Sequence, residues 1–436
     1  MNVDDLILVD VDEHVIEPPH LFEGRLPAKY QDKAPRLITR EDGTMAWVYE
    51  GTEMPNVALN ATAGRPREEI GYEPTTFDEL RPGCYDIHAR VKDMDANGVL
   101  SAICFPQFVR FCGQIFTELG TDRDQAKAMV EAYNDWHIDE WAGTYPGRII
   151  PCAIPMLWDA EACAAEIRRV AAKGCRAMTF SASPYALGLP SIHTDYWDPV
   201  WKAAVDENVV IAMHLGSSSQ QPVTSPDAPV EVVHTLTPIT VYETAADIVW
   251  SKMFHKFPDL RVSLTEGGIG WIPYFLERVD YLYSYTKYFS GTDLNGKLPS
   301  EIFNEHVYLC FVVDGHGLES LHRMNIDNVM WECDYPHSTN TWPHSPEVAI
   351  KYMGDLLDDD QINKITWQNA NRAYSWDPFA HIPKEQANVG ALRQRAIGWD
   401  VSEKSTIHLR PDAALRLDKS TPITIGTMSG DRTLKM

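Results

Sequence analysis

Side chains suited to metal binding stand at the ends of apolar runs in this sequence. Asp12 and His14 follow the first run, His214 ends a later one, and Asp334 follows the run that breaks at Pro336. Asp12 and His14 are two residues apart, so both side chains lie on the same face of an extended chain. Two imidazoles and two carboxylates are sufficient to bind one divalent ion with an open coordination position.

Three side chains are candidates for catalysis. Asp334 is expected to be both a ligand and a proton carrier, because a carboxylate beside a metal-bound water can take and return its proton. Glu266, which ends another apolar run, can act as a base or orient the water. His337, three residues beyond Asp334, is either a proton donor or a surface-loop histidine.

Structural explanations exist for each of these residues taken alone. A single histidine at a strand end is more often a hydrogen-bonded structural residue, and a single aspartate after a strand is usually a helix N-cap. Four metal-competent groups at three strand exits are hard to produce by capping alone. The coincidence favours a metal site.

Substrate binding has three candidates: Phe180 at a strand end, Arg110 and His316. Arg110 could bind a substrate carboxylate, although an arginine in an acidic chain is more often an ion-pair partner.

The elements that must position these residues alternate regularly. Short apolar segments predict strands at 6–11, 99–105, 149–154, 175–180, 209–214, 260–265, 307–312 and 329–333. Amphipathic segments predict helices between them at 87–97, 122–144, 159–173, 196–207, 238–257, 271–285 and 317–324. Eight such units favour an α/β fold closed into a (β/α)8 TIM barrel, whose functional residues project from the carboxyl ends of the strands.

Two segments depart from this alternation. Residues 17–85 form a long insertion after the first strand, with a hairpin expected over 36–50, and are predicted to act as a lid or substrate loop. Residues 1–375 would form the barrel domain. Residues 376–436 are polar and weakly periodic, and are expected to pack on the barrel or on a neighbouring subunit.

Composition limits the classes of function. A formal net charge of −24 argues against nucleic acid or an anionic membrane as a partner. No apolar run reaches the roughly 20 residues that cross a bilayer, and the first residues do not resemble a signal peptide, so the sequence predicts a cytoplasmic protein. The eight cysteines are dispersed without a CxxC pair and are expected to be reduced core residues.

Several motifs together resemble a known family: residues 10–18 (DVDEHVIEP), 213–216 (MHLG), 266–273 (EGGIGWIP), 277–280 (ERVD), 334–337 (DYPH) and 369–372 (NANR). They are similar to the amidohydrolase superfamily, in the amidohydrolase-2 group that includes aminocarboxymuconate-semialdehyde decarboxylase and the hydroxybenzoate-type decarboxylases. The resemblance spans the chain to about residue 375. It implies a barrel with one divalent ion held by Asp12, His14, His214 and Asp334, and a homodimer or higher homo-oligomer.

Two positions differ from the decarboxylase pattern. Asp12 with His14 replaces a pair of histidines and resembles the hydroxybenzoate-type version. The carboxylate makes the site harder, so manganese or magnesium competes with zinc, which remains the expected ion. Glu266 stands where a catalytic histidine is common, and a glutamate needs a strongly raised pKa to act as an acid near neutral pH.

The predicted reaction is therefore metal-dependent, non-oxidative decarboxylation of a small aromatic or unsaturated carboxylic acid. The alternative, motivated by Glu266, is hydrolysis of a carbon-carbon, ester, lactone or amide bond. A barrel retained only as a binding scaffold is the third interpretation, and intact ligands argue against it.

Overall fold

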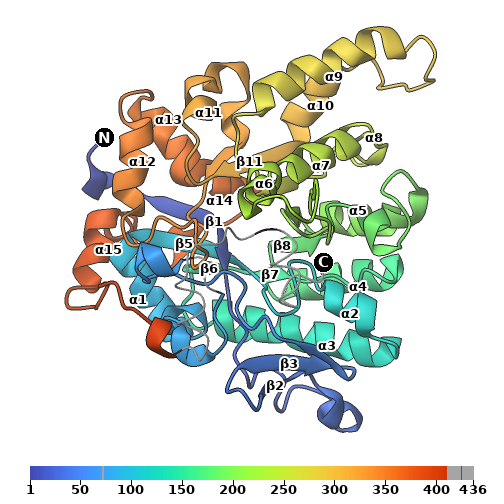
Figure 1. The fold of residues 1–436 in the computed structure, drawn as a ribbon. Coiled ribbons are helices and arrows are strands. Elements are labelled where there is room, and N and C mark those ends of the chain that lie inside the picture. Colours follow the sequence, from blue (N-terminus) through green and yellow to red (C-terminus); the bar gives the residue numbers. More distant parts are fainter. Residues whose placement is uncertain (71–72, 410–423, 425–436) are drawn as a thin grey trace.

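Parallel strands occupy the middle of the molecule and helices surround them (Figure 1). The computed structural model describes residues 1–70, 73–409 and 424. The parallel strands are β1 Leu8–His14, β5 Val99–Phe105, β6 Ile149–Ile150, β7 Cys152–Ala153, β8 Ala177–Phe180, β9 Val210–His214, β10 Val262–Thr265, β11 Val307–Phe311 and β12 Val329–Trp331. They pair in the orders β1-β5-β6 and β12-β11-β10-β9-β8-β7. The predicted alternation of strands and helices is confirmed.

The third predicted strand is divided in two. Pro151 separates β6, which pairs with β5, from β7, which pairs with β8. A proline has no N–H to donate to a ladder, so the pairing changes partner at this residue.

The last strand meets the first through hydrogen bonds beyond the end of β12. Asp334 N donates to Asp12 O at 2.8 Å, and His14 N donates to Tyr335 O at 2.7 Å. Within the described residues no regular ladder joins β12 to β1. The barrel is therefore closed by the segment that carries the candidate ligands.

The helices that cover the barrel are α1 Ile87–Asn97, α2 Gln114–Leu119, α3 Arg123–Trp136, α4 Ala160–Ala172, α5 Asp198–Asp206, α6 Val230–Leu236, α7 Ile239–Val249, α8 Met253–Lys256, α9 Ile272–Thr286, α10 Pro299–His306, α11 Gly315–Glu319, α12 Ser345–Met353, α13 Asp359–Asn363 and α14 Asn369–Ala373. Three predicted helices are interrupted. The helix expected over 317–324 is divided into α11 and a 3-10 helix, Leu321–Arg323. The helix expected over 238–257 breaks between α7 and α8, and the helix expected over 122–144 continues beyond α3 as a π-helical turn, His137–Ala142.

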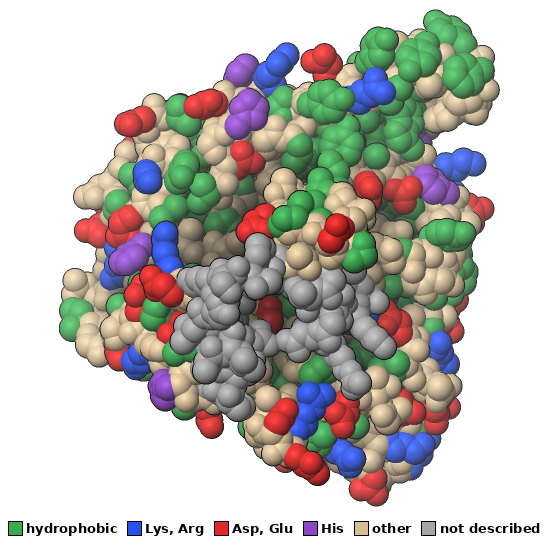
Figure 2. Space-filling model, viewed as in Figure 1, with side chains coloured by type: hydrophobic (Ala, Val, Ile, Leu, Met, Phe, Trp, Pro, Cys, Tyr) green, Lys and Arg blue, Asp and Glu red, His purple; other side chains and the backbone are tan. Residues whose placement is uncertain are grey.

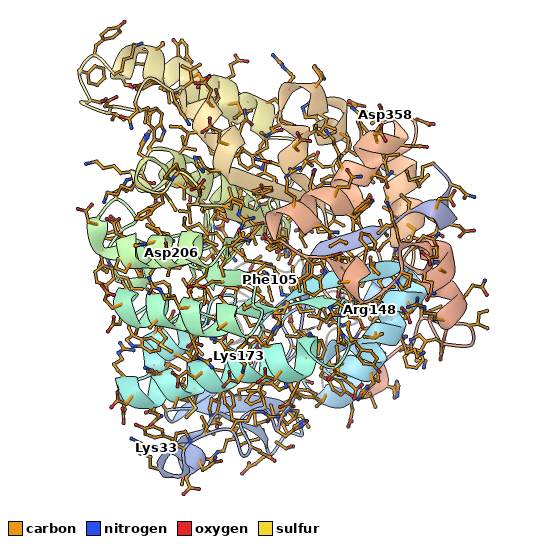
Figure 3. The ribbon with its side chains drawn as sticks, turned by 180° about the vertical axis from the view of Figure 1, so that it is seen from behind. Lys33, Phe105, Arg148, Lys173, Asp206 and Asp358 are labelled. Carbon is orange, nitrogen blue, oxygen red and sulfur yellow. The ribbon has the colours of Figure 1, made fainter. Side chains whose placement is uncertain are left out.

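Both faces of the strands are buried, as the unbroken apolar runs indicate. Every residue of β1 and β5 is buried. Val9, Val210 and Ala212 belong to an inner apolar cluster, whereas Ile211 and Met213 belong to the outer cluster beneath the helices. Seen from behind, Phe105 at the end of β5 lies in the middle of the molecule, and Lys33 and Asp358 lie near opposite edges (Figure 3).

The insertion after β1 contains a small antiparallel sheet of β2 Arg36–Thr39, β3 Met45–Tyr49 and β4 Thr52–Met54. The predicted hairpin is present, and a third strand extends it. The Trp47 ring stacks on Phe108 with the centroids 4.2 Å apart. The insertion thus packs on the segment that follows β5.

The described part of the C-terminal extension contacts the barrel. It contains α15 Val389–Arg395, and Val389 N donates to Leu6 O at 2.8 Å just before β1. Further along, Trp399 Nε1 donates to Asp93 Oδ1 at 2.7 Å, and Lys404 N donates to Gly64 O at 2.8 Å. Residues 410–423 and 425–436 of the predicted extension lie outside the described residues.

All eight cysteines are buried and unpaired, which agrees with the prediction of reduced core residues. A search of the described helices finds none with the length and apolar character needed to cross a membrane.

Candidate metal centre

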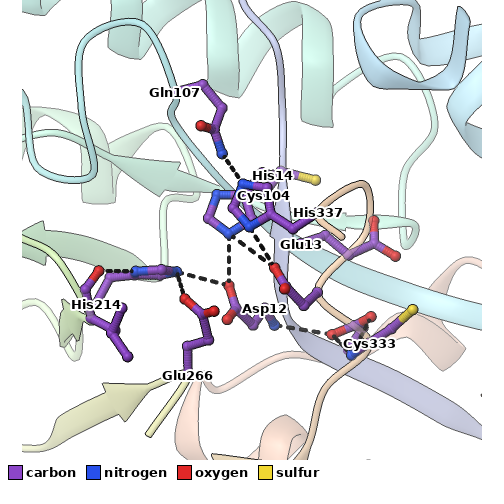
Figure 4. Close-up of polar contacts among 12 residues, drawn as sticks. Asp12, Glu13, His14, Cys104, Gln107, His214, Glu266, Cys333 and His337 are labelled. Atoms are coloured by element: carbon purple, nitrogen blue, oxygen red, sulfur yellow. Dashed lines mark hydrogen bonds and ion pairs between the residues drawn. The ribbon is translucent and has the colours of Figure 1, made fainter. Parts of the chain in front are cut away.

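The four predicted ligands lie at or just beyond the carboxyl ends of β1, β9 and β12. Figure 4 shows three of them, Asp12, His14 and His214, side by side. Asp12 Oδ1 lies 3.2 Å from His214 Nε2 and 3.4 Å from His14 Nε2. Asp334 Oδ1 lies 3.5 Å from His14 Nε2. The side chains come from positions 12 to 334 of the sequence, and His14 contacts both carboxylates.

A bulge in β1 aims the first two ligands. The register with β5 shifts between Asp10 and Glu13, so β1 has one residue more than its neighbour there. Bulges of this kind re-aim side chains next to active sites. The buried Asp10 carboxylate accepts a hydrogen bond from Asp12 N at 3.0 Å and another from Cys333 N at 3.0 Å, which ties the bulge to the Asp334 segment.

His214 is held by its own strand end and by two aromatic rings. Its Nδ1 lies 2.6 Å from Leu215 O, an arrangement that leaves Nε2 facing Asp12. Phe111 stacks on the imidazole with the centroids 4.3 Å apart, and Phe105 meets it edge-on at 4.7 Å. The ring orientation of His214 is therefore fixed from three sides.

Asp334 is paired with His337. Asp334 has a left-handed backbone with φ of 62°, a conformation that aspartate adopts more readily than most residues. His337 Nδ1 lies 2.8 Å from Asp334 Oδ1, and Thr339 Oγ1 donates to the other carboxylate oxygen. The His337 ring lies 3.8 Å from the His14 ring between centroids, so it stands beside the four ligands.

A buried carboxylate supports His337 from the opposite side. Gln107 Nε2 lies 2.7 Å from His337 Nε2. The backbone at Gln107 is fixed in turn by Glu17, whose carboxylate accepts from Gln107 N at 3.0 Å and from Phe108 N at 2.8 Å. Both ring nitrogens of His337 thus have a fixed neighbour.

Glu266 borders the centre without joining its closest contacts. Its Oε2 lies 3.8 Å from His214 Nε2, and its side chain is 25% exposed. Its φ of 63° is unusual for a glutamate and gives a strained backbone beside the candidate centre. Asp314 holds the following loop by accepting from Ile269 N at 2.8 Å and Gly270 N at 2.6 Å.

The surrounding charges shift the pKa values of the carboxyl groups in the centre in opposite directions. Burial acts to raise the pKa of Asp12, but His214 and His14 outweigh it and lower the pKa. At Asp334, burial also acts to raise the pKa, but the nearby His337 and His14 outweigh it and the pKa is lowered. By contrast, burial together with Asp334 and Asp12 raises the pKa of Glu266 well above its ordinary value.

The residues present fit a divalent ion. Asp12, His14 and His214 form one group whose ligand atoms lie within 4.8 Å of one another, and His14, Asp334 and His337 form a second. Both ring nitrogens of His14 and Asp12 Oδ2 are buried and have no hydrogen-bond partner among the described residues. Buried polar atoms of this kind require a partner, and an ion among two imidazoles and two carboxylates supplies one.

The predicted substrate-binding residues are not gathered at the centre. Phe180 is buried in the outer cluster against Trp197 and Trp201. Arg110 pairs with Glu118 at 2.8 Å, and His316 is exposed on α11. Arg110 Nη1 also lies 3.4 Å from Ser219 Oγ.

A cavity of about 400 Å³ lies beside that ion pair. Its lining comprises Glu118, Ala186, Leu187, Ser219, Gln220 and Gln221. Ser219 to Gln221 follow His214 along the chain, so the cavity lies at the outer end of the loop that begins at the centre.

Sequence reasoning missed three residues that shape the centre. Phe111 covers His214, Asp314 holds the Glu266 loop, and Thr339 contacts Asp334. Asp314 had a usable signal, since it follows the strand that ends at Phe311 and precedes a glycine, where parallel strands present functional groups. Phe111 and Thr339 lie in irregular loops without such a signal.

Comparison with known structures gives the same fold. An amidohydrolase from Mycobacterium avium subsp. paratuberculosis K-10 is 20% identical with a TM-score of 0.64, over 84% of this chain and 99% of that one. The 5-carboxyvanillate decarboxylase from Sphingomonas paucimobilis is 19% identical with a TM-score of 0.58, over 85% and 100%. A dihydroxybenzoic acid decarboxylase from Polaromonas sp. JS666, with bound manganese and 2-nitroresorcinol, is 17% identical with a TM-score of 0.56, over 84% and 96%.

Comparison with curated protein sequences gave no significant match. A sequence model of the family described as amidohydrolase matches residues 9–376, which run from the second residue of β1 past the last strand and include all the candidate ligands. The chain therefore belongs to the amidohydrolase family and is an enzyme.

Proposed function

We propose that this enzyme binds one divalent ion through Asp12, His14, His214 and Asp334 and decarboxylates a small aromatic acid without an oxidant. The observation that carries the proposal is the contact between His337 and Asp334 beside the other three ligands. This contact supports a proton-carrying pair beside the proposed ion. Structural neighbours of this chain include decarboxylases of aromatic acids, which supports the same class of reaction.

The bound ion would supply positive charge that holds the substrate carboxylate and a neighbouring oxygen. His337 and Asp334 share a proton, which His337 delivers to the ring carbon that bears the carboxylate. The bond from that carbon to the carboxylate then breaks, its electron pair returns to the ring, and carbon dioxide leaves. His337 regains a proton from solvent.

The protonation of His337 supports this role. Burial acts to lower the pKa of His337, but Asp334 outweighs it and the pKa is raised. The imidazolium therefore persists to higher pH than that of an ordinary histidine. Gln107 on the far nitrogen keeps the ring in the plane that reaches Asp334.

We assign the insertion 17–85 the role of a substrate lid. Thr62 N and Ala63 N donate to Pro336 O at 2.9 and 3.0 Å, next to the ligand segment. Trp47 stacks on Phe108, the neighbour of Gln107. The insertion is thus attached to both sides of His337, and its shape would limit which acids enter.

The deciding experiment separates carbon dioxide release from water addition. The metal-loaded enzyme would be incubated in D2O with hydroxylated and methoxylated benzoates, and carbon dioxide would be measured together with deuterium in the product. We expect carbon dioxide in step with substrate loss and one deuterium on the ring carbon. Turnover of these acids without carbon dioxide would contradict the proposal.

Hydrolysis is the second candidate, and Glu266 favours it. Its raised pKa allows it to keep a proton that a leaving group would take, while Asp334 accepts a proton from water. Esters, lactones and amides of the same acids, assayed in water labelled with oxygen-18, would test this alternative. Label in the acid product, without carbon dioxide, would establish a hydrolase.

The identity of the ion can be tested on the same preparation. Two carboxylates and two imidazoles suit zinc and also manganese, which a structural neighbour contains. Elemental analysis, followed by activity after exchange of each ion, would distinguish them.

The eight reduced thiols also fit a reducing compartment, and we assign the protein to the cytoplasm.

A further inference from the structure

A buried guanidinium and a buried carboxylate on α1 contact the segments that carry the candidate ligands. Figure 2 shows charged side chains spread over the visible face of the molecule, where water solvates them. Arg90 and Asp93 are instead 0% and 1% exposed. Burying a charge is costly unless it is paired and hydrogen-bonded. The partners of these two side chains therefore indicate what they hold in place.

The carboxylate of Asp93 accepts hydrogen bonds from three distant parts of the chain. Arg81, in the insertion, pairs with it, and the distance from Nη2 to Asp93 Oδ1 is 2.7 Å. The Tyr335 hydroxyl donates to Oδ2 at 2.7 Å. Trp399 Nε1, in the C-terminal extension, donates to Oδ1 at 2.7 Å. Asp93 therefore joins the insertion and the extension to the residue that follows Asp334.

Tyr335 connects this network to the candidate metal centre. Its carbonyl oxygen accepts a hydrogen bond from His14 N at 2.7 Å. The Arg90 guanidinium lies 4.6 Å from the centroid of the Tyr335 ring. Arg90 also donates to His14 O, and to the carboxylate of Glu13 at 2.9 Å. A displacement of Tyr335 would therefore move the backbone of two proposed ligands, His14 and Asp334.

The hydrogen bond between Asp93 and Tyr335 lies in a tightly packed region. A Cβ added at Gly83 would overlap Asp93 Oδ2 and would lie 2.7 Å from the Tyr335 hydroxyl oxygen. Closely packed groups transmit displacement, because they have little free space to absorb it. A change in the position of Asp93 is therefore passed on to Tyr335.

The C-terminal extension fixes Asp93 from the outer side. In Figure 1, α15 lies beside α1, and the chain that leaves α15 reaches Asp93 at Trp399. The next residue, Asp400, accepts a hydrogen bond from Arg81 Nη2 at its carbonyl oxygen at 2.6 Å. Trp399 lies beyond residue 376, where the match to the family model ends. The N–H that reaches Asp93 therefore comes from outside the part of the chain that the family model describes.

We propose that Trp399 is a positioning residue for the metal centre. Its N–H fixes the Asp93 carboxylate, and that carboxylate fixes Tyr335. Tyr335 in turn sets the backbone position of the ligands His14 and Asp334. The inference rests on the metal centre of the proposed function and does not depend on the reaction catalysed there. Groups that orient metal ligands through other residues change metal affinity or activity by about 10- to 100-fold when they are removed.

The test compares Trp399→Phe with the wild type, both as full-length enzyme loaded with Mn²⁺. The variant keeps an aromatic ring and loses the N–H donor. Metal retained against increasing chelator gives the dissociation constant for Mn²⁺, and urea unfolding without metal gives the stability. We expect Trp399→Phe to weaken Mn²⁺ binding by about 10-fold. A role in stability alone would lower the midpoint of urea unfolding and leave the dissociation constant unchanged.

A matched control removes the N–H of a second half-buried tryptophan. Trp376 Nε1 donates to Ser101 Oγ at 3.2 Å, away from Asp93 and Tyr335. We expect Trp376→Phe to bind Mn²⁺ as the wild type does. An equal weakening of Mn²⁺ binding in Trp376→Phe and Trp399→Phe would overturn the inference.

A double-mutant cycle tests the route through Tyr335. Tyr335→Phe removes the hydroxyl that contacts Asp93 and should weaken Mn²⁺ binding at least as much as Trp399→Phe does. Combining the two changes should add nothing further, because both interrupt one chain of contacts. Additive losses, or equal dissociation constants in Trp399→Phe and the wild type, would overturn the inference. A wild type that holds no stoichiometric Mn²⁺ would disprove the proposed metal centre itself, and the inference with it.

Discussion

His337 Nδ1 lies 2.8 Å from Asp334 Oδ1, while the opposite nitrogen of the same ring lies 2.7 Å from the amide of Gln107. One end of the imidazole therefore meets the candidate metal centre, and the other meets a side chain fixed by the buried Glu17. This geometry links the insertion side of the barrel to the ligand segment through a single ring. It also separates two roles that can be tested independently, ligand and proton donor.

Asp334→Asn should abolish activity while the protein remains folded. The change keeps the size of the side chain but removes the charge that faces His14 and His337. Loss of proton transfer alone lowers turnover by about 10² to 10⁴, and weaker ion binding adds to this. Turnover and bound metal should both fall. Asp358→Asn, which alters the cap of a surface helix, serves as the control, and wild-type turnover in Asp334→Asn would disprove the assignment.

His337→Gln should lower turnover without removing the ion. His337 is proposed as a proton donor beside the four ligands, so the expected loss is about 10² to 10⁴ in turnover with metal content unchanged. His322→Gln on the exposed surface is the matched control. A variant that loses both metal and activity would instead identify His337 as a ligand.

The pH profile provides a second test of His337. Asp334 raises the pKa of His337 against the effect of burial, so the protonated donor persists above the usual range of histidine and is lost as the pH rises further. Turnover of the wild type should fall on the alkaline side. That alkaline limb should be absent from the residual turnover of His337→Gln.

The positions of the candidate ligands could be predicted from two features of the sequence. Asp12, His214 and Asp334 each stand where a long apolar run stops, and parallel strands end on the same side of a barrel. The bulge in β1 left this prediction intact, because Asp12 lies within the bulge and His14, two residues on, pairs with Phe105 at the end of the ladder. Residues at the carboxyl ends of the strands are therefore the part of the site that can be predicted from this sequence.

The direction of a side chain within a strand was harder to predict. Alternation shows that Met178 and Phe180 share a face, but it does not say which face points to the centre. In the structure both pack in the outer cluster, and Ala177 lies in the inner one. Phe111 and Thr339 depend on loops whose contacts join distant parts of the sequence, and no local pattern encodes such contacts.

Asp314→Ala should weaken activity through the Glu266 loop. The carboxylate accepts hydrogen bonds from Ile269 N and Gly270 N, so its removal leaves Glu266 free to move. We expect turnover to fall by about 10 to 100-fold with metal content unchanged, and Asp314→Asn to show a smaller loss. Asp314 is in addition the N-cap of α11, where it accepts a hydrogen bond from Gly317 N at 2.8 Å. Asp358→Ala deletes the comparable cap of α13 and should cost about 1 kcal/mol of stability without a loss of turnover. Equal activities in the two alanine variants would show that Asp314 acts only as a cap.

Gly216→Ala should displace Phe111 from His214. Gly216 has φ of 82°, and an added Cβ would lie 2.8 Å from the Phe111 ring. Gly188 has φ of 75° with nothing within 4 Å, so Gly188→Ala measures the backbone cost alone. That cost is about 1 kcal/mol, and Gly216→Ala should exceed it in thermal unfolding and also weaken metal binding. Equal effects in the two variants would mean that Phe111 does not support His214.

Glu17→Gln should change how stability depends on pH. Burial raises the pKa of Glu17 to about 7, above its ordinary value of 4.5. Between these values the folded protein holds a proton that the unfolded chain has released, so stability present at low pH is lost as the pH rises towards 7. The full difference corresponds to about 3 kcal/mol.

The variant cannot titrate at this position. The wild type should therefore lose stability relative to Glu17→Gln between pH 5 and about pH 8, as measured by urea unfolding of both proteins in the presence of a chelator. A difference that stays constant over this range would show that Glu17 is ionised throughout, and that its charge is balanced by the hydrogen bonds from Gln107 N and Phe108 N. Whichever result is found, Glu17→Gln should also lower turnover if it moves the Gln107 backbone, because Gln107 orients the proposed proton donor His337.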